Sequence, residues 1–235
     1  MKRFYETVGV EQREEETLFR VNLDTRTIKS PARHDLLIPT RALADAIADE
    51  WRAQGDEVVL ASMPLTRLAS GAIDRVATHR ADVIDEVAAY AETDLLCYRA
   101  DHPVELSKRQ HDVWQPVLDW MESRYQAKFA TTVGVVPVTQ SPAALEAARA
   151  AIAAQDDMTL AALHAVTHAS GSVILALALV DGHIDAPALV AASQLDEQFQ
   201  IEQWGEDAEA AERRAALAAA ITASARFVAL LQRTF

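Results

Sequence analysis

The spacing of apolar residues changes near residue 40. Before that point, residues 18–23 and 27–29 hold β-branched, aromatic and other apolar side chains in partly alternating order, separated by a turn candidate at residues 24–26. This pattern predicts a β-hairpin. Residues 36–38, which precede Pro39, predict a further short strand. The first part of the chain is therefore expected to form a small, mostly antiparallel β module.

From Thr40 onward the apolar residues recur at helical spacing. Thr40 is a plausible N-cap, and Leu43, Ile47 and Trp51 define one apolar stripe before Gly55. Further helices are predicted at about residues 65–80, 81–92, 106–125, 142–154, 159–180, 187–203 and 206–231. Pro116 is expected to kink or divide one of them, because proline has no N–H for the helical hydrogen bond. Residues 129–140, which are rich in Val and Thr, predict a strand or an extended connector.

These elements predict an α+β fold, with a small N-terminal antiparallel β domain at residues 1–60 and a larger, mainly α-helical domain at residues 61–235. The 235 residues are 50% apolar, which is enough for a sizeable core. The longest uninterrupted apolar run, residues 173–180, is shorter than the roughly 20 residues that a membrane-spanning helix needs. We therefore expect this run to be buried in a protein that does not insert into a membrane.

A single cysteine and an N-terminus without a signal-like apolar stretch predict a reducing, cytoplasmic location. The formal charge is −13, and residues 150–212 contain eleven acidic residues and no Lys or Arg. The negative electrostatic potential of these residues repels phosphate backbones and anionic lipid, so nucleic acid and membranes are not expected partners. Two interpretations of the acidic stretch stay open, a solubilising surface and a docking patch.

The sequence shows no catalytic constellation. The seven glycines are scattered and form neither of the phosphate-binding patterns G-x-x-x-x-G-K and G-x-G-x-x-G, and no serine lies in G-x-S-x-G. Cys97 has apolar neighbours, which predicts a buried, unreactive thiol. We therefore expect no catalytic residues and no cofactor.

His164 and His168 are spaced to lie on one face of a helix, as a pair of metal ligands would. The residues between them lack the glutamate of H-E-x-x-H, and the sequence does not reveal a third ligand. We expect no metal site, with ordinary histidines at the edge of the core. A metal-dependent enzyme that uses His164 and His168 with nearby carboxylates is the alternative hypothesis.

A contact surface is the remaining possibility, and residues 202–207 are the strongest candidate for it. Gly205 can end one helix, and the acids after it favour the positive N-terminus of the next. Trp204 is either a core side chain at this corner or an aromatic anchor for a partner. We select Glu202, Trp204, Glu206 and Asp207 as candidate partner-binding residues.

Seven collinear segments resemble the ATP synthase assembly chaperone family that binds the free alpha subunit of the catalytic head. They span nearly the whole chain, at residues 21–26, 50–54, 63–68, 93–99, 114–120, 171–172 and 203–207. In the family the turn at residues 24–26 usually carries Gly where this chain has Thr25. A positive φ there would strain Thr25.

The resemblance implies a non-catalytic chaperone without metal or nucleotide. It would cover apolar surface of the free alpha subunit until the beta subunit replaces it. The expected partner is therefore the alpha subunit of the ATP synthase catalytic head. The resemblance also implies a β domain joined to a helical domain, and the bacterial, cytoplasmic form of a family that has mitochondrial members.

Overall fold

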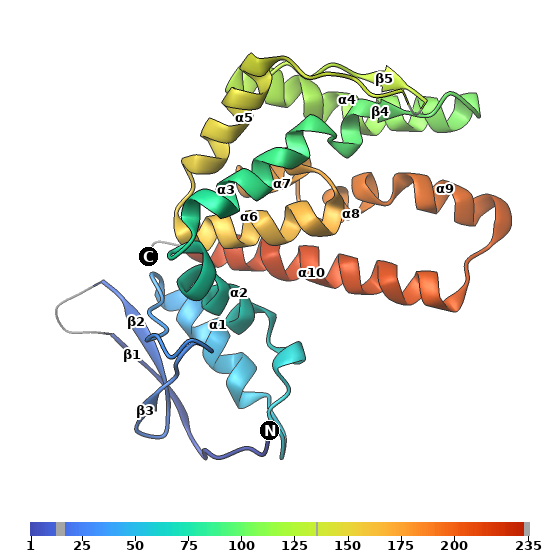
Figure 1. Cartoon of the computed structure of the whole chain (residues 1–235). Helices are drawn as coiled ribbons and strands as arrows, with labels where there is room; N and C mark the ends of the chain where they lie inside the picture. The colour runs from blue at the N-terminus through green and yellow to red at the C-terminus, as the bar shows by residue number, and fades with distance from the viewer. Residues whose placement is uncertain (13–16, 135, 233–235) are drawn as a thin grey trace. The chain divides into compact units, whose positions relative to one another are not determined.

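The computed structural model describes residues 1–12, 17–134 and 136–232. A small antiparallel sheet precedes a mainly helical region, which confirms the predicted α+β fold (Figure 1). The chain forms two compact units. One contains residues 1–80 and 157–162 and the end of the chain from Ala223, and the other contains residues 81–156 and 163–222. The division into domains at residue 60 stays a prediction.

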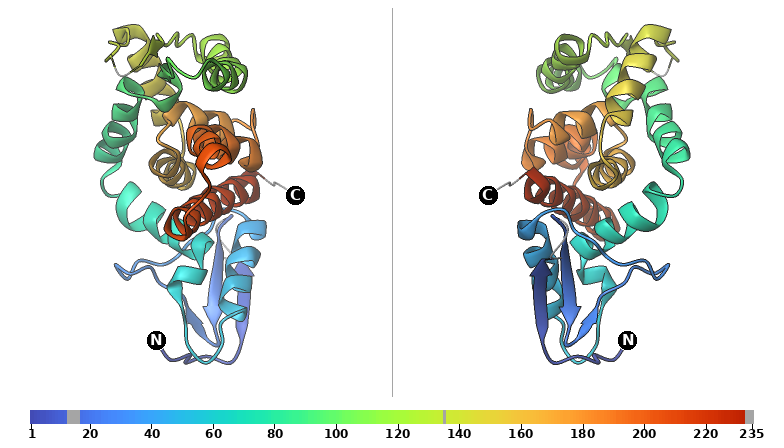
Figure 2. Two further views of the ribbon diagram at one scale, coloured as in Figure 1. Left: turned by 90° about the vertical axis from the view of Figure 1, so that its right-hand side faces the viewer. Right: turned by 90° about the vertical axis from the view of Figure 1, so that its left-hand side faces the viewer.

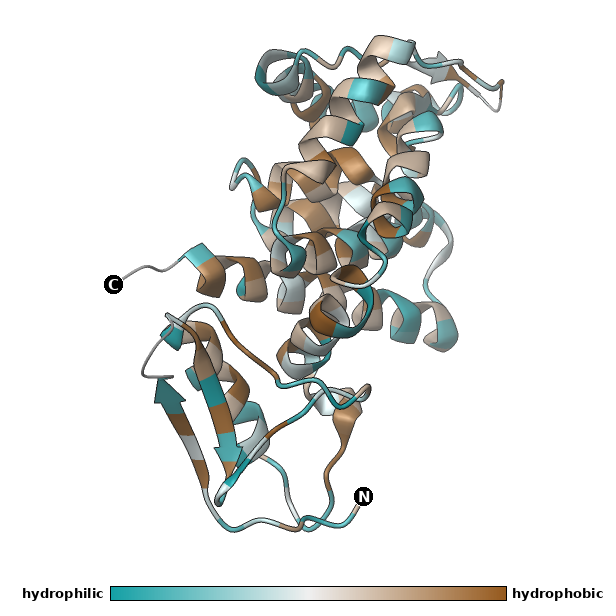
Figure 3. Ribbon diagram, turned by 60° about the vertical axis from the view of Figure 1, so that its left-hand side comes forward, coloured by the Kyte–Doolittle hydropathy of each residue, from teal (hydrophilic) through white to brown (hydrophobic). Residues whose placement is uncertain are grey.

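The sheet of the first unit has the order β1-β2-β3, with strands β1 (Val8–Gln12), β2 (Phe19–Leu23) and β3 (Arg26–Thr27). Both strand pairs are antiparallel, and β2 and β3 form the predicted hairpin. Apolar and polar residues alternate along β2 (Figure 3). The expected strand at residues 36–38 is wrong in extent, because the chain there makes only isolated bridges, Phe19 to Ile38 and Lys29 to Asp35.

Asp24 makes the hairpin turn possible without strain at Thr25. Asp24 has a φ of 53°, whereas Thr25 is not among the residues with positive φ. Aspartate tolerates this left-handed conformation better than the β-branched threonine. Its carboxylate also accepts hydrogen bonds from the backbone N–H and the hydroxyl of Thr7, at 2.8 and 3.0 Å. The steric penalty anticipated for Thr25 therefore does not arise.

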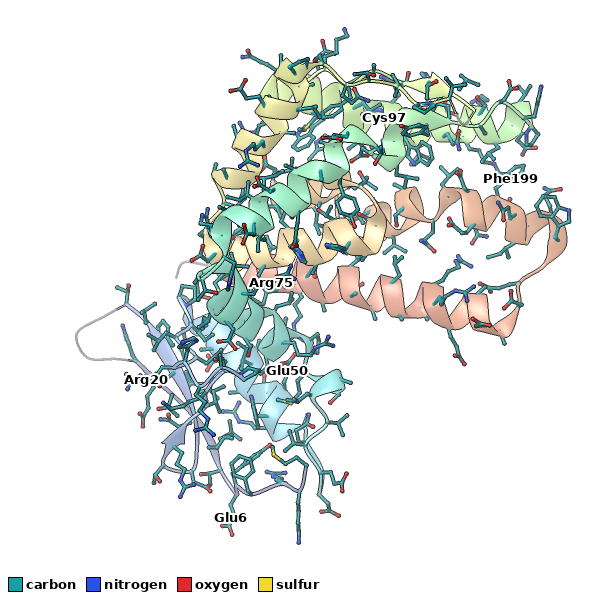
Figure 4. The ribbon with its side chains drawn as sticks, in the orientation of Figure 1. Glu6, Arg20, Glu50, Arg75, Cys97 and Phe199 are labelled. Carbon is teal, nitrogen blue, oxygen red and sulfur yellow. The ribbon has the colours of Figure 1, made fainter. Side chains whose placement is uncertain are left out.

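Helix α1 (Arg41–Arg52) packs against β1 and β2, as Figure 2 shows. Thr40 caps it by accepting a hydrogen bond from the Leu43 N–H, which confirms the predicted N-cap. The carboxylate of Glu50, labelled in Figure 4, reaches the start of α2 (Pro64–Gly71) and accepts from the N–H groups of Leu65 and Thr66, both at 2.8 Å. Glu50 thus joins α1 to α2 through two N–H groups that have no partner within the helix.

The remaining helices are α3 (Arg80–Ala89), α4 (Val104–Tyr125), α5 (Pro142–Ala153), α6 (Asp157–Ser170), α7 (Val173–Val180), α8 (Ala186–Ser193), α9 (Leu195–Trp204) and α10 (Ala208–Gln232). Shorter helical turns are η1 (Leu60–Ser62), η2 (Ala72–Val76), η3 (Tyr90–Glu92) and η4 (Leu95–Cys97). Two-residue strands β4 (Tyr98–Arg99) and β5 (Thr132–Val133) pair in parallel, so the predicted extended connector contains a strand.

Four details of the predicted helices are corrected. The expected helix at residues 65–80 changes to the wider π turn η2 after Gly71. The expected helix at 159–180 is divided at Gly171, whose φ of +71° a side chain would oppose, and the one at 187–203 is divided at Gln194. Pro116 lies inside a continuous α4 and does not divide it, and the kink expected as the alternative stays a prediction.

The core of the second unit is built around α7, in which all eight residues are buried, as the apolar run predicts. Cys97, labelled in Figure 4, is also fully buried. Burial, together with a smaller effect of the Asp94 carboxylate, raises the pKa of its thiol to about 12. The predicted burial of this thiol is therefore confirmed, and its lack of reactivity stays a prediction.

Helix α10 differs from α7, because no side chain at residues 208–220 is buried. Its most apolar stretch has a mean hydropathy of 1.5, so by length and composition α10 could cross a membrane. Much of this apolar character comes from alanine, which also favours a helix in water. We therefore take α10 as an alanine-rich helix that is exposed over residues 208–220 and partly buried from Ile221 onward, and the absence of membrane insertion stays a prediction.

Candidate functional site

The end of α9 and the start of α10 form a sharp corner around Gly205. This residue has φ 84° and ψ 170°, a conformation that is almost restricted to glycine. Asp207 then caps α10, because its carboxylate accepts a hydrogen bond from the Ala210 N–H at 2.9 Å. The sequence therefore folds into two consecutive helices with Trp204 at the turn between them.

Trp204 lies at the surface and does not belong to the core. Its exposed fraction is 79%, the largest among the big apolar side chains of the described residues. Burying such a side chain is strongly favourable, so an exposed tryptophan marks a surface suited to contact. The core alternative for Trp204 is therefore wrong, and its role as an aromatic anchor stays a prediction.

Trp204, Glu206 and Asp207 line one groove, of about 440 Å³, between α9 and α10. The other lining residues are Gln194, Glu197, Gln200, Ile201, Gly205, Ala210, Arg213, Arg214 and Leu217. The lining of the groove therefore combines apolar side chains with charges of both signs. Three of the four candidate partner-binding residues are brought together here.

The groove is less acidic than the sequence led us to expect. Arg214 donates to the Glu206 carboxylate at 2.5 Å and to the side-chain oxygen of Gln198 at 2.8 Å. Arg213 pairs with Glu209 at 2.6 Å. In sequence, these two arginines directly follow the stretch without basic residues. Because the chain turns at Gly205 and α10 runs back beside α9, Arg214 lies against residues of that stretch.

Glu202 is the candidate that does not line the groove. Its carboxylate accepts a hydrogen bond from Arg109 of α4 at 2.7 Å, and Arg109 also binds Glu105 at 2.9 Å. The hydrogen bond from Arg109 lowers the pKa of Glu202, and the same contact raises the pKa of Arg109. Glu202 therefore joins α9 to α4 and is already paired.

Sequence reasoning missed Ile201, Arg213, Arg214 and Leu217. Arg213 and Leu217 are four positions apart on α10, so they share a face, as residues at this spacing do in a helix. That face meets α9 only because Gly205 reverses the chain. Helical spacing could have grouped Arg213 with Leu217, but it could not show which helix they would meet.

Asp94 is fully buried in the interior and does not line this groove. The two histidines lie on one face of α6, as predicted, with ring centroids 4.4 Å apart. Neither histidine nor Cys97 lines the groove. The groove itself offers apolar contact and hydrogen bonding, which suit binding of a protein segment.

Known proteins resemble this chain in sequence and in structure. The family profile of the ATP12 chaperone protein matches residues 2–122. The crystal structure of Atp12 from Paracoccus denitrificans is 42% identical, with a TM-score of 0.92 and coverage of 98% of both chains. A putative chaperone of Agrobacterium tumefaciens, Atu1473, is 40% identical, with a TM-score of 0.93 and coverage of 98% of this chain and 86% of that one.

A curated relative extends the similarity to eukaryotes. "Protein atp12, mitochondrial" of Schizosaccharomyces pombe is 24% identical over 216 residues, which cover 87% of this chain and 74% of the relative. The profile match covers more than half of the chain, and the bacterial structures match along almost all of it. The chain therefore belongs to the ATP12 chaperone family, a family of ATP synthase assembly factors.

Proposed function

We propose that this chain is a non-catalytic chaperone that binds the free alpha subunit of the ATP synthase catalytic head and shields it until the beta subunit replaces it. Membership of the ATP12 family supports the role in assembly. The choice of the alpha subunit rests on the resemblance of the seven sequence segments. The cytoplasm of a bacterial cell is the proposed location.

The exposed Trp204 beside the groove is the observation that carries the binding role. Subunits that pack against each other permanently have large apolar surfaces, which aggregate while they are unpaired. A chaperone for such a surface needs exposed apolar groups of its own. Trp204, together with Ile201 and Leu217 in the groove, supplies them at one place.

Helix α10 also has an exposed side with small side chains, which points away from the side that carries Leu217. Ala215, Ala216 and Ala219 are exposed on the helix that also carries Leu217. Small side chains allow a partner backbone to approach closely, and Arg213 and Arg214 can change partners from neighbouring carboxylates to client groups. Trp204, Glu206 and Asp207 are thus proposed to contact the client directly.

Glu202 has a different place in this proposal. Because it is held by Arg109, it contributes by fixing α9 against α4 and by presenting a partly exposed ion pair at the rim of the surface. Charged pairs at the rim of an interface steer the encounter more than they tighten the complex. Release follows if the beta subunit binds alpha more tightly than the chaperone does, so no nucleotide is required.

Light scattering tests this function directly. Isolated alpha subunit, diluted from denaturant, should scatter less light when the chaperone is present at near-equal molar ratio and no nucleotide is added. Addition of beta subunit should then release the chaperone, which size-exclusion chromatography detects. Unchanged scattering, or protection of the beta subunit instead of alpha, would contradict the proposal. A matched amount of serum albumin controls for non-specific protection.

A further inference from the structure

The two histidines of α6 are arranged as a pair of metal ligands. They are four residues apart, which places both on one side of the helix. Their rings are tilted by 48° to each other, with centroids 4.4 Å apart. His164 is half-buried and His168 is exposed, so an ion can reach the pair from solvent.

Helix α3 supplies the third ligand that sequence spacing could not reveal. A carboxylate oxygen of Glu86 lies 3.2 Å from Nε2 of His164. One ligand atom from each of Glu86, His164 and His168 can be chosen so that all three lie within 4.8 Å of one another. The carboxylate comes from residue 86 and the imidazoles from residues 164 and 168, so only the fold brings them together.

Tyr90 orients the second histidine. It follows Glu86 by four residues, and its hydroxyl lies 3.0 Å from Nδ1 of His168. When Nδ1 carries the proton and donates to this oxygen, the lone pair of His168 is on Nε2. A hydrogen bond to the non-coordinating nitrogen is the usual support of a metal-bound histidine, because it fixes the tautomer and the orientation of the ring.

We propose that Glu86, His164 and His168 form a binding site for a divalent transition-metal ion of the zinc type. Two imidazoles and one carboxylate suit Zn²⁺, whereas Mg²⁺ and Ca²⁺ prefer oxygen ligands. Zinc binds nitrogen and oxygen at about 2.0–2.2 Å, so the three ligand atoms must draw together around it. Small adjustments of the Glu86 and His168 side chains would bring the three ligand atoms to these distances.

Binding of the ion would connect α3 to α6, and its remaining coordination positions would be open to water or to a client side chain. This site is independent of the groove, because none of its three ligands lines that surface. The expectation from sequence that the histidines bind no metal rested on the missing third ligand. Glu86 removes that objection. The competing explanation is a simple Glu86–His164 ion pair, and the experiment must distinguish the two.

Isothermal titration calorimetry with Zn²⁺ provides the test. The whole chain is treated with chelator, dialysed and titrated, and one ion per chain is expected. Glu86→Gln and His168→Gln change exposed side chains, so the fold should be retained. Each should weaken Zn²⁺ binding by about 100-fold or more, and Tyr90→Phe should weaken it by about tenfold, as the loss of an orienting hydrogen bond does.

His111→Gln is the matched control, because His111 is also an exposed helical histidine but belongs to α4. It should leave zinc binding unchanged. Co²⁺ should give a visible absorption band with the parent chain and lose it in His168→Gln. Binding that is equally strong in the parent and in His168→Gln, or no saturable binding by a folded parent, would overturn the metal site and leave the ion pair.

Discussion

The Ser172 hydroxyl donates to the buried carboxylate of Asp94 and lies 2.8 Å from one of its oxygens and 3.0 Å from the other. The N–H groups of Leu96 and Ile174 donate to the same carboxylate, both at 3.1 Å. Asp94 therefore ties the start of α7 to η4 across the core of the second unit. Two of the segments that resemble the family, residues 93–99 and 171–172, meet in this contact.

The stability of the protein should fall as Asp94 ionises. Burial raises the pKa of this carboxyl from 3.8 to about 6, although the hydrogen bonds that it accepts oppose the change. The folded state thus binds the proton more tightly than the unfolded chain. This contribution is fully present below about pH 4 and is lost as the pH rises through about 6, and a shift of roughly two pKa units corresponds to about 3 kcal/mol.

Urea unfolding of the parent and of Asp94→Asn between pH 4 and pH 7 measures this effect. The other carboxyl groups titrate in both proteins, so their contributions cancel in the difference between the two free energies of unfolding. The parent should lose stability relative to the variant up to about pH 6. A difference that stays constant over this range would show that Asp94 ionises at its ordinary pKa.

Trp204→Ala should weaken binding of the alpha subunit by about 2 kcal/mol or more, as loss of an aromatic anchor does. The melting temperature should change little, because the side chain is already exposed. Val104→Ala is the matched control, since Val104 is 74% exposed on another helix. Calorimetry of both variants against alpha subunit, with thermal unfolding of each, measures the two quantities. Equal binding of Trp204→Ala and parent would place the client surface elsewhere.

The charge of the groove is best tested at Glu197, which is exposed and lines it. Asp207 is less suitable because it caps α10, and losing such a cap costs about 0.5–2 kcal/mol of stability. If the client face is basic, Glu197→Lys should weaken binding, and most strongly at low salt, where repulsion is least screened. Glu146→Lys, an exposed change on α5, is the control. Affinities of the Glu197 variant that do not depend on salt would argue against a charged contact.

Gly171→Ala should destabilise the protein by about 1 kcal/mol or more through backbone strain alone. Gly171 has a φ of +71°, and an added Cβ would meet no atom within 4 Å. Gly55→Ala is the matched control, because its surroundings are equally open and its φ is not positive. That change should be neutral or slightly stabilising. Chemical denaturation of both variants compares them, and equal stabilities would show that the division between α6 and α7 does not depend on glycine.

Local sequence signals predicted much of the fold, and their failures have identifiable causes. Thr40 and α1 were found because a cap and an apolar stripe coincide. The division at Gly171 was missed because apolar residues continue on both sides of it, and periodicity alone does not register a positive φ. Strand β1 was missed because Val8 and Val10 are its only large apolar residues, and pairing with β2 stabilises it.

The candidate surface could be predicted in part. Trp204 and its acidic neighbours are adjacent in sequence, so the segment stood out, and Gly205 indicated the corner. Whether Trp204 points into the core or outward depends on where α10 lies after the turn. The pairing of Glu202 with Arg109 and the approach of Glu86 to His164 join residues 93 and 78 positions apart, and nothing in the local pattern encodes them.

The absence of buried side chains at residues 208–220 has a consequence for motion. Most helices in proteins are held by burial of an apolar face, and this half of α10 has little of it. Lifting its first turns away from α9 should therefore cost far less free energy than global unfolding, with the hydrogen bond from Arg214 to Gln198 of α9 as a main restraint. Its amide hydrogens should exchange with solvent much sooner than those of α7. The surface formed by α9 and α10 would then change shape to fit an irregular client surface, while the core around α7 stays folded.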